Sequence, residues 1–221
     1  MTSKLDTVLQ NIQTAAKSTD RKATDITLVA VSKTKAIDVI TPILQQGQRI
    51  FGENKVQEAG EKWPVLREQY PDIELHLIGP LQTNKTRQAI QIFDVIETVD
   101  RPKLARAIAR ISREENKVCP CYIQINVGRE DQKAGIDPDK ADSFIALCRD
   151  ELNLPVLGLM CIPPAGQDPE PYFLLLKEIA RRNGLSKLSM GMSSDYQTAI
   201  RCGSTSVRVG TAIFGIRQNK K

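Results

Sequence analysis

Histidine and long apolar runs are scarce in this sequence of 221 residues. The single histidine, His76, leaves almost no material for histidine-rich metal sites or histidine-based catalytic triads. No run approaches the roughly 20 apolar residues that cross a bilayer, so no membrane partner is expected. The first residues, MTSKLDTVLQNIQTAAK, lack the continuous apolar core of a signal peptide and predict an amphipathic helix over 1–17.

Cysteine is present in an odd number and without the spacing of a disulfide framework. The five cysteines are at positions 119, 121, 148, 161 and 202. This pattern predicts a reduced, cytoplasmic protein with structural thiols. Cys119 and Cys121 form a Cys-x-Cys pair without a second pair at zinc-finger spacing, and their apolar surroundings favour strand packing over a metal site.

The charge balance does not point to a nucleic-acid surface. The net charge is +5, but basic residues alternate with acidic ones, and the only basic cluster is RQNKK in a predicted polar tail, 216–221. Hydrophobic residues make up 41% of the chain, which is enough for one sizeable core. Because no linker, repeat or low-complexity segment divides it, we expect a single domain over residues 1–221.

Apolar runs of strand length alternate with helical patterns along the whole chain. The predicted strands are 26–33, 49–54, 74–80, 94–100, 121–128, 154–164, 187–192 and a last one within 206–215. Helical patterns follow nearly every strand, for example at 36–47, ending at Gly47, and at 56–70, where Pro64 is expected to bend or break the helix. The count predicts an α/β fold, a (β/α)8 TIM barrel with an extra N-terminal helix. A doubly wound open sheet is the alternative.

The first strand, ITLVAVSK, ends on a lysine that its position makes unusual. Lys33 follows seven residues of predicted core strand, at the end where barrel enzymes place their active sites. Burial lowers the pKa of a lysine and favours the free amine, which is the form that attacks an aldehyde. The alternative is a lysine whose stem packs on the protein while its ammonium reaches water.

Two loops late in the chain have the composition of a phosphate site. Residues 191–195 place glycine and two serines, Ser193 and Ser194, between a strand and a short helix. Arg208, Gly210 and Thr211 follow at the last strand, and barrel phosphate sites commonly use the loops after strands seven and eight. Such a turn also serves backbone geometry alone, and Asp195 is expected to be a helix N-cap rather than a catalytic acid.

Five segments resemble one known family. They are LVAVSKTK (28–35), FGENKVQE (51–58), HLIGPLQTNK (76–85), GLMCIPP (158–164) and SMGMSSDYQTAIRCGSTSVRVGTAIFG (189–215). Together they resemble the pyridoxal phosphate homeostasis proteins, also called YggS- or PROSC-like. The fold of that family is similar to the barrel domain of alanine racemase, a fold type III pyridoxal-phosphate protein. The resemblance runs from the first predicted strand to the last.

The resemblance implies a role for each residue singled out above. It implies that Lys33 holds pyridoxal 5′-phosphate (PLP) as a Schiff base, with the phosphate in the loops around Ser193, Ser194, Gly210 and Thr211. Arg208 is expected near the pyridine nitrogen, where a cation discourages protonation and makes the cofactor a poorer electron sink. The remaining expected cofactor contacts, which are equally readable as barrel-interior residues, are Asn54, His76 and Met190.

Two positions depart from the family pattern. Lys55 follows FGEN where many members have an aromatic residue, so an aromatic wall at that point is in doubt. Cys161 takes a place that alanine often holds; it is either a reactive thiol near the pocket or, as we favour, a small packing residue. Lys35 and Lys133 are expected at the mouth of the barrel, either as solvated lysines or as transient acceptors of the aldehyde.

The resemblance also favours a carrier of PLP over an enzyme. A racemase needs acid–base groups on both faces of its substrate, and alanine racemase takes its second base from a separate β domain of a partner subunit. The sequence leaves no room for that C-terminal β domain, so we expect a monomer without catalytic residues that supplies PLP to apo-enzymes. An amino-acid racemase is the alternative. A nucleic-acid binder is a third class, for which we expect no binding.

Overall fold

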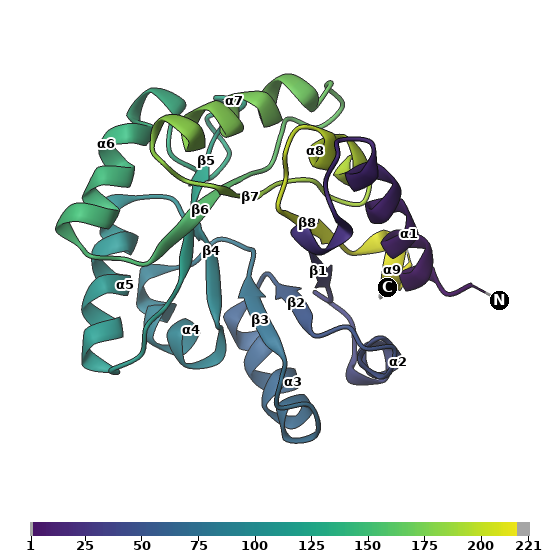
Figure 1. Ribbon diagram of the computed structural model, residues 1–221. Coiled ribbons are helices and arrows are strands. Elements are labelled where there is room, and N and C mark those ends of the chain that lie inside the picture. The colour runs from purple at the N-terminus through teal and green to yellow at the C-terminus, as the bar shows by residue number, and fades with distance from the viewer. Residues whose placement is uncertain (1, 216–221) are drawn as a thin grey trace.

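The computed structural model describes residues 2–215, which form a closed barrel of parallel strands with helices around it (Figure 1). The strands are β1 Thr27–Val31, β2 Ile50–Glu53, β3 Glu74–Leu77, β4 Val95–Val99, β5 Cys121–Ile125, β6 Val156–Cys161, β7 Lys187–Ser189 and β8 Ser206–Val209. Their order around the barrel is their order in the chain. The predicted (β/α)8 barrel is therefore confirmed, and the open-sheet alternative is wrong. The predicted tail at 216–221 lies outside the described residues.

Helices separate the strands as the sequence pattern predicts. They are α1 Lys4–Lys17, α2 Ile37–Gln45, α3 Val56–Gln69, α4 Thr86–Ile92, α5 Pro102–Glu114, α6 Ala141–Ala146, α7 Glu170–Arg182, α8 Tyr196–Arg201 and α9 Thr211–Phe214. Short 3-10 turns occupy Ala23–Asp25, Thr83–Lys85 and Pro138–Lys140, and a π-helical turn, Leu147–Glu151, extends α6. None of the helices within residues 2–215 has the length and apolar character to span a membrane.

Pro64 does not break its helix, contrary to expectation. Helix α3 runs without interruption from Val56 to Gln69 and carries Pro64 on its exposed side. A proline removes one intrahelical hydrogen bond, but buried side chains anchor the helix on both sides of that point. Ala59 and Trp63 are fully buried before the proline, and Leu66 is buried after it. Tertiary packing therefore outweighs the local cost of the proline.

Pairing between the first and last strands closes the barrel. Thr27 of β1 is opposite Ser206 of β8, and Ala30 is opposite Val209. The two strand ends approach so closely that a Cβ at Gly210 would lie 3.2 Å from the carbonyl oxygen of Val31. Closure thus brings the segment after β1 beside the loop after β8, although nearly the whole chain separates them.

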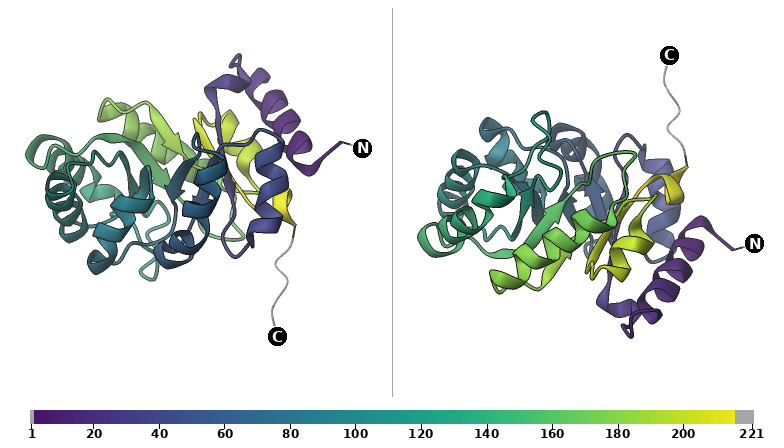
Figure 2. Two further views of the ribbon diagram at one scale, coloured as in Figure 1. Left: turned by 90° about the horizontal axis from the view of Figure 1, so that it is seen from below. Right: turned by 90° about the horizontal axis from the view of Figure 1, so that it is seen from above.

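The N-terminal helix α1 packs outside this junction. In Figures 1 and 2, α1 lies beside α8 and α9, and its buried face contacts both helices. Ser3 caps the helix by accepting a hydrogen bond from the Asp6 N–H, and the Asn11 side-chain amide donates to the Tyr196 hydroxyl at 3.0 Å. Helix α1 therefore supports the two short helices that follow the strands β7 and β8.

Gly158 in β6 provides a test of this packing. A Cβ at Gly158 would lie 1.9 Å from the carbonyl oxygen of Lys187 in β7. We therefore expect Gly158→Ala to lower the free energy of unfolding by about 1–3 kcal/mol or more. Gly60→Ala in α3 is the control, because its Cβ meets only the tips of two side chains, Ile92 at 3.3 Å and Gln88 at 3.8 Å, and alanine favours helix; we expect a change within about 1 kcal/mol. Urea denaturation measures both, and equal effects would contradict the packing at β6 and β7.

Candidate functional site

A cavity of about 490 Å³ lies at the carboxyl ends of the strands, on the face where barrel proteins place their sites. Its volume is in the range of small-molecule pockets. The lining residues are Val31, Lys33, Ile78, Ile162, Met192, Ser193, Ser194, Arg208, Gly210 and Thr211. The walls therefore combine branched apolar side chains with one lysine, one arginine and three hydroxyl groups. This composition suits a flat, partly apolar ligand that carries an anionic group.

Lys33 lies in the turn that follows β1. The turn is closed by a hydrogen bond from the Lys35 N–H to the Ser32 carbonyl at 3.0 Å, and Thr34 has a positive φ of 65°. For a β-branched residue this left-handed conformation costs on the order of 1–3 kcal/mol. The turn sends Lys33 into the cavity, whereas the Lys35 Nζ donates to the carbonyls of Phe214 and Gly215 at 3.3 and 3.5 Å. The two lysines of SKTK thus face different surroundings.

The loop after β7 has a shape that only glycine permits. Gly191 has a φ of 95°, and a Cβ there would lie 2.5 Å from the Cβ of Ala199. The predicted N-cap position of Asp195 is confirmed, because it immediately precedes α8. Its carboxylate, however, accepts the N–H of Met192 at 2.6 Å and closes the loop instead of bonding within the helix.

Ser193 joins this loop to the one after β8. Its Oγ accepts the backbone N–H groups of Gly210 at 3.2 Å and Ala212 at 3.5 Å. Because the oxygen accepts both of these bonds, the hydroxyl hydrogen of Ser193 can serve as a donor to an anion. Ser194 and Thr211 add two further hydroxyl groups on the same side of the cavity. The two loops therefore form one surface of hydrogen-bond donors.

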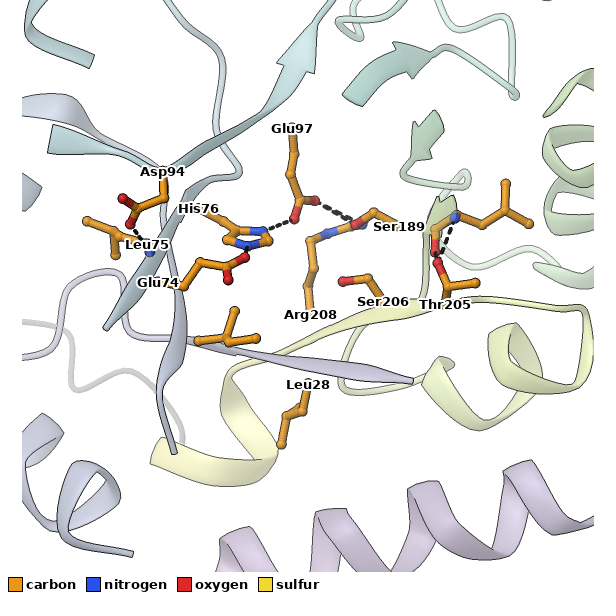
Figure 3. A network of polar contacts seen from close by, with 12 residues as sticks. Leu28, Glu74, Leu75, His76, Asp94, Glu97, Ser189, Thr205, Ser206 and Arg208 are labelled. Atoms are coloured by element: carbon orange, nitrogen blue, oxygen red, sulfur yellow. Dashed lines mark hydrogen bonds and ion pairs between the residues drawn. The ribbon is translucent and has the colours of Figure 1, made fainter. Parts of the chain in front are cut away.

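Arg208 lies at the inner end of the cavity and is almost completely buried, at 4% exposure. Its guanidinium donates to the Ser189 hydroxyl at 2.6 Å and to the Cys161 carbonyl at 2.8 Å, and it lies 3.8 Å from the Glu97 carboxylate (Figure 3). A buried arginine needs such partners because an unpaired charge in the interior is very costly. These contacts hold the cation in one place.

His76 lies behind Arg208 rather than in the cavity wall. Its Nδ1 is 2.6 Å from Glu97 and its Nε2 is 2.7 Å from Glu74, so Glu97 joins the histidine to the arginine (Figure 3). Burial by itself lowers the pKa of His76, but hydrogen bonds to the two carboxylates outweigh it and raise the pKa to about 9. For Glu97 burial by itself raises the pKa of the carboxyl. The hydrogen bond and charge of His76, together with the charge of Arg208, outweigh burial and lower the pKa overall. The interior of the barrel thus holds alternating charges.

The structure brings together six of the nine predicted site residues. Lys33, Ser193, Ser194, Arg208, Gly210 and Thr211 line the same cavity. The other three lie elsewhere: Asn54 lines a neighbouring cavity, Met190 is fully buried in the core, and His76 belongs to the charge network. None of these three is among the residues that line the cavity of Lys33.

Some residues of the site were not singled out from the sequence. Ile78 and Ile162 form apolar walls, and Glu97 and Ser189 hold Arg208. Glu97 has a signal that could have identified it, because an acidic residue interrupts the apolar run DVIETVD. The isoleucines have no such signal, since they look like any other strand residue.

The five cysteines are buried, and Lys55 and Lys133 are not among the residues that line the cavity. All five cysteines are free and buried, and burial raises the pKa of the Cys161 thiol to about 12, which favours packing over reactivity. Cys121 is buried in β5, as the strand-packing interpretation predicts. Lys133 pairs with Glu130 and donates to the Pro163 carbonyl, and Lys55 is exposed. Among residues 2–215, no group of three or more histidine, cysteine or acidic residues could hold a metal ion.

The raised pKa of His76 predicts how stability depends on pH. A folded-state pKa of about 9, above the ordinary 6.5, contributes stability that is full below pH 6.5 and is lost as the pH rises through 9. We expect this loss to reach about 3 kcal/mol. Denaturation at several pH values should show that His76→Gln flattens the pH dependence of stability between pH 6.5 and 9. Glu97 keeps its contacts with Ser189 and Arg208 in this variant. An unchanged slope in the variant would contradict the assignment.

Known proteins of one family match this chain along nearly its whole length. The family described as "Alanine racemase, N-terminal domain" matches residues 3–218. The pyridoxal phosphate homeostasis protein of Haemophilus influenzae is 42% identical over 96% of this chain and 94% of that protein. Its Escherichia coli K12 counterpart is 38% identical over 97% and 95%.

Solved structures agree with these sequence relationships. PipY of Synechococcus elongatus, solved with PLP bound, has 34% identity and a TM-score of 0.78, covering 93% of this chain and all of that chain. Alanine racemase of Clostridium difficile shares the fold at 14% identity, with a TM-score of 0.68 over 96% of this chain and 57% of its own. From the fold, the cavity and these relationships, the chain belongs to the pyridoxal phosphate homeostasis protein family, within the alanine racemase N-terminal domain family.

Proposed function

We propose that this protein binds PLP reversibly and takes part in PLP homeostasis and amino-acid and keto-acid balance. The observation that carries the proposal is that Lys33 and two donor-rich loops line one cavity of about 490 Å³. An amine suits the aldehyde of PLP, and the loops suit its phosphate. PipY, a relative at 34% identity, has been solved with PLP bound, and the homeostasis proteins of several bacteria are named for this cofactor.

In this proposal different residues of the cavity bind the aldehyde, the phosphate and the ring of the cofactor. In this proposal Lys33 holds PLP as a Schiff base, and Ser193, Ser194, Gly210 and Thr211 bind the phosphate. The absence of a side chain at Gly210 keeps the junction with Val31 open, since a Cβ there would already touch its carbonyl at 3.2 Å. Ile78 and Ile162 supply apolar walls for the ring. The residues present therefore fit the cofactor.

Arg208 is the proposed partner of the pyridine nitrogen. Bound PLP supplies an electron sink whose strength depends on the charge near its ring nitrogen. Arg208 does not give up a proton, and its contacts with Ser189, Cys161 and Glu97 hold it in place. In the proposal His76 supports Arg208 through Glu97, whereas Met190 and Asn54 are contacts at the margin of the site. This arrangement favours keeping the cofactor over activating it.

The ionisable groups of the cavity support a carrier rather than an enzyme. Among the described residues that line it, only Lys33 and Arg208 can carry a charge. A racemase needs a second acid–base group across the substrate from the lysine, and apart from Lys33 and Arg208 the polar side chains of the described lining are hydroxyls. The alternative enzyme function remains a specific rival because the fold is shared with alanine racemase and a hydroxyaspartate dehydratase.

The proposal includes a cellular setting. Five free, buried thiols suit a reducing compartment, so we place the protein in the cytoplasm. Apo-enzymes that require PLP are the proposed recipients, and a monomer is the proposed state. Ultracentrifugation and transfer of cofactor to an apo-enzyme address these two points directly.

Trapping of the imine identifies the reactive lysine. Borohydride reduction of the PLP-loaded protein, followed by peptide mapping, should place the label on Lys33 and lose it in Lys33→Ala. Lys35→Ala is the matched control, because Lys35 donates to carbonyls of the last helix and does not line the cavity. Label on Lys35 in the wild type, or retained labelling in Lys33→Ala, would contradict the proposed attachment site.

Turnover separates the carrier from the enzyme. We expect the PLP-loaded protein to leave a panel of L- and D-amino acids without sustained racemisation, because the cavity lacks a second acid–base group. Chiral chromatography over many equivalents of substrate measures this. Sustained racemisation that disappears in Lys33→Ala would establish the rival function.

A further inference from the structure

The segment SKTK contains two lysines that differ in position by only two residues, yet their amines point to different places. Lys33 lines the cavity, while the Lys35 Nζ donates to the carbonyls of Phe214 and Gly215 at the end of α9. A flexible turn would let either amine approach an aldehyde in the cavity. Something must therefore fix the backbone between Ser32 and Lys35.

The turn itself does not supply that rigidity. Thr34, between the lysines, has a φ of 65°, a region that glycine and asparagine adopt readily and β-branched residues avoid. Left to local preferences, the backbone at Thr34 would move to a negative φ and change the direction of Lys33. A conformation of this kind persists only where surrounding contacts impose it.

Glu58 of α3 supplies one such contact. Its Oε1 accepts the backbone N–H of Thr34 at 2.6 Å, which ties the left-handed residue to the neighbouring βα unit. The same oxygen lies 2.8 Å from the Lys62 Nζ, one helical turn further along α3. The Glu58 carboxylate therefore binds the backbone of the turn on one side and the Lys62 ammonium on the other.

Lys62 completes the arrangement. Its side chain is only 10% exposed, and its ammonium lies 3.3 Å from the Ser32 carbonyl and 3.2 Å from the Lys35 carbonyl, the first and last residues of the turn. It also pairs at 2.7 Å with Glu53, a fully buried carboxylate at the end of β2. Glu53 in turn accepts the Ser32 hydroxyl at 2.7 Å and the Trp63 indole N–H at 3.2 Å.

We propose that Glu58 and Lys62 are positioning residues that lock the Ser32–Lys35 turn, so that Lys33 rather than Lys35 presents its amine to the cavity. This inference rests on the proposed function. In the reaction they serve, the neutral amine nitrogen of Lys33 bonds to the aldehyde carbon of PLP. The carbonyl oxygen leaves as water with the two amine protons. Neither Glu58 nor Lys62 touches the reacting atoms; they act on the backbone that carries Lys33.

The test separates binding of the ligand from formation of the imine. Glu58→Ala should slow the first-order imine step about tenfold, the equivalent of one hydrogen bond to a charged group. Affinity for pyridoxine 5′-phosphate, which has no aldehyde, should stay at the wild-type value because neither Glu58 nor Lys62 lines the cavity. Stopped-flow absorbance measures the first quantity and calorimetry the second. Glu61→Ala, an exposed glutamate on the same helix, is the matched control and should change neither.

Rescue by glycine distinguishes positioning from a general loss of structure. In Glu58→Ala/Thr34→Gly, glycine adopts the positive φ without cost, so most of the imine rate should return. If Glu58→Ala does not fold, Glu58→Leu, which has no acceptor for the Thr34 N–H, replaces it with the same glycine rescue. A wild-type rate in the glutamate variants, or a slow rate that glycine does not restore, overturns the inference.

Borohydride mapping keeps this inference distinct from the proposed function. Label on Lys33 in the wild type, with less label or label shifted to Lys35 in Glu58→Ala, supports both. Label confined to Lys33 at equal rates in both proteins overturns the positioning role alone. No labelled lysine in the wild type overturns the proposed function itself.

Discussion

Closure of the barrel between β1 and β8 is the constraint on which the site depends. The register that places Thr27 opposite Ser206 and Ala30 opposite Val209 sets the distance between the turn of Lys33 and the loop of Gly210. Neither segment is a binding site alone. The lysine lacks an anion site nearby in sequence, and the donor-rich loops lack an amine. Pairing of the first and last strands makes one cavity from these two halves.

Buried charges lie behind that cavity. Two networks pass through the interior: Glu53, Glu58 and Lys62 beneath the Lys33 turn, and the chain of groups from Glu74 to Arg208 through the barrel. Burying ions is unfavourable unless each is paired, so the members of such a network depend on one another. Removing one member leaves an uncompensated charge inside the protein. The cost of that state restricts how far any member can move.

The sequence was sufficient for the barrel, because alternating apolar runs predicted its eight strands. Lys33 and Ser193 were singled out because polar residues after core strands are conspicuous, whereas Arg208 lies within β8 and was singled out by the phosphate-site pattern and the family resemblance. The roles of these residues stay predictions. Of the two effects expected of Pro64, a break in the helix does not occur, because local propensity does not include the packing of Trp63 against the barrel. The expected contacts of Met190 and Asn54 with the cofactor stay predictions, because neither residue is among those that line the cavity of Lys33. The networks depend on contacts between distant segments, which no local pattern reveals.

The division of the cavity between the two ends of the chain bears on protein synthesis. Lys33 leaves the ribosome early, whereas Gly191 to Thr211 leave it among the last residues of the described fold. A nascent or prematurely terminated chain has the lysine without the donor-rich loops. Only a completed barrel has both halves of the cavity. Because a ligand that binds only the folded form stabilises it, a ligand of this cavity would stabilise the completed chain and not a fragment.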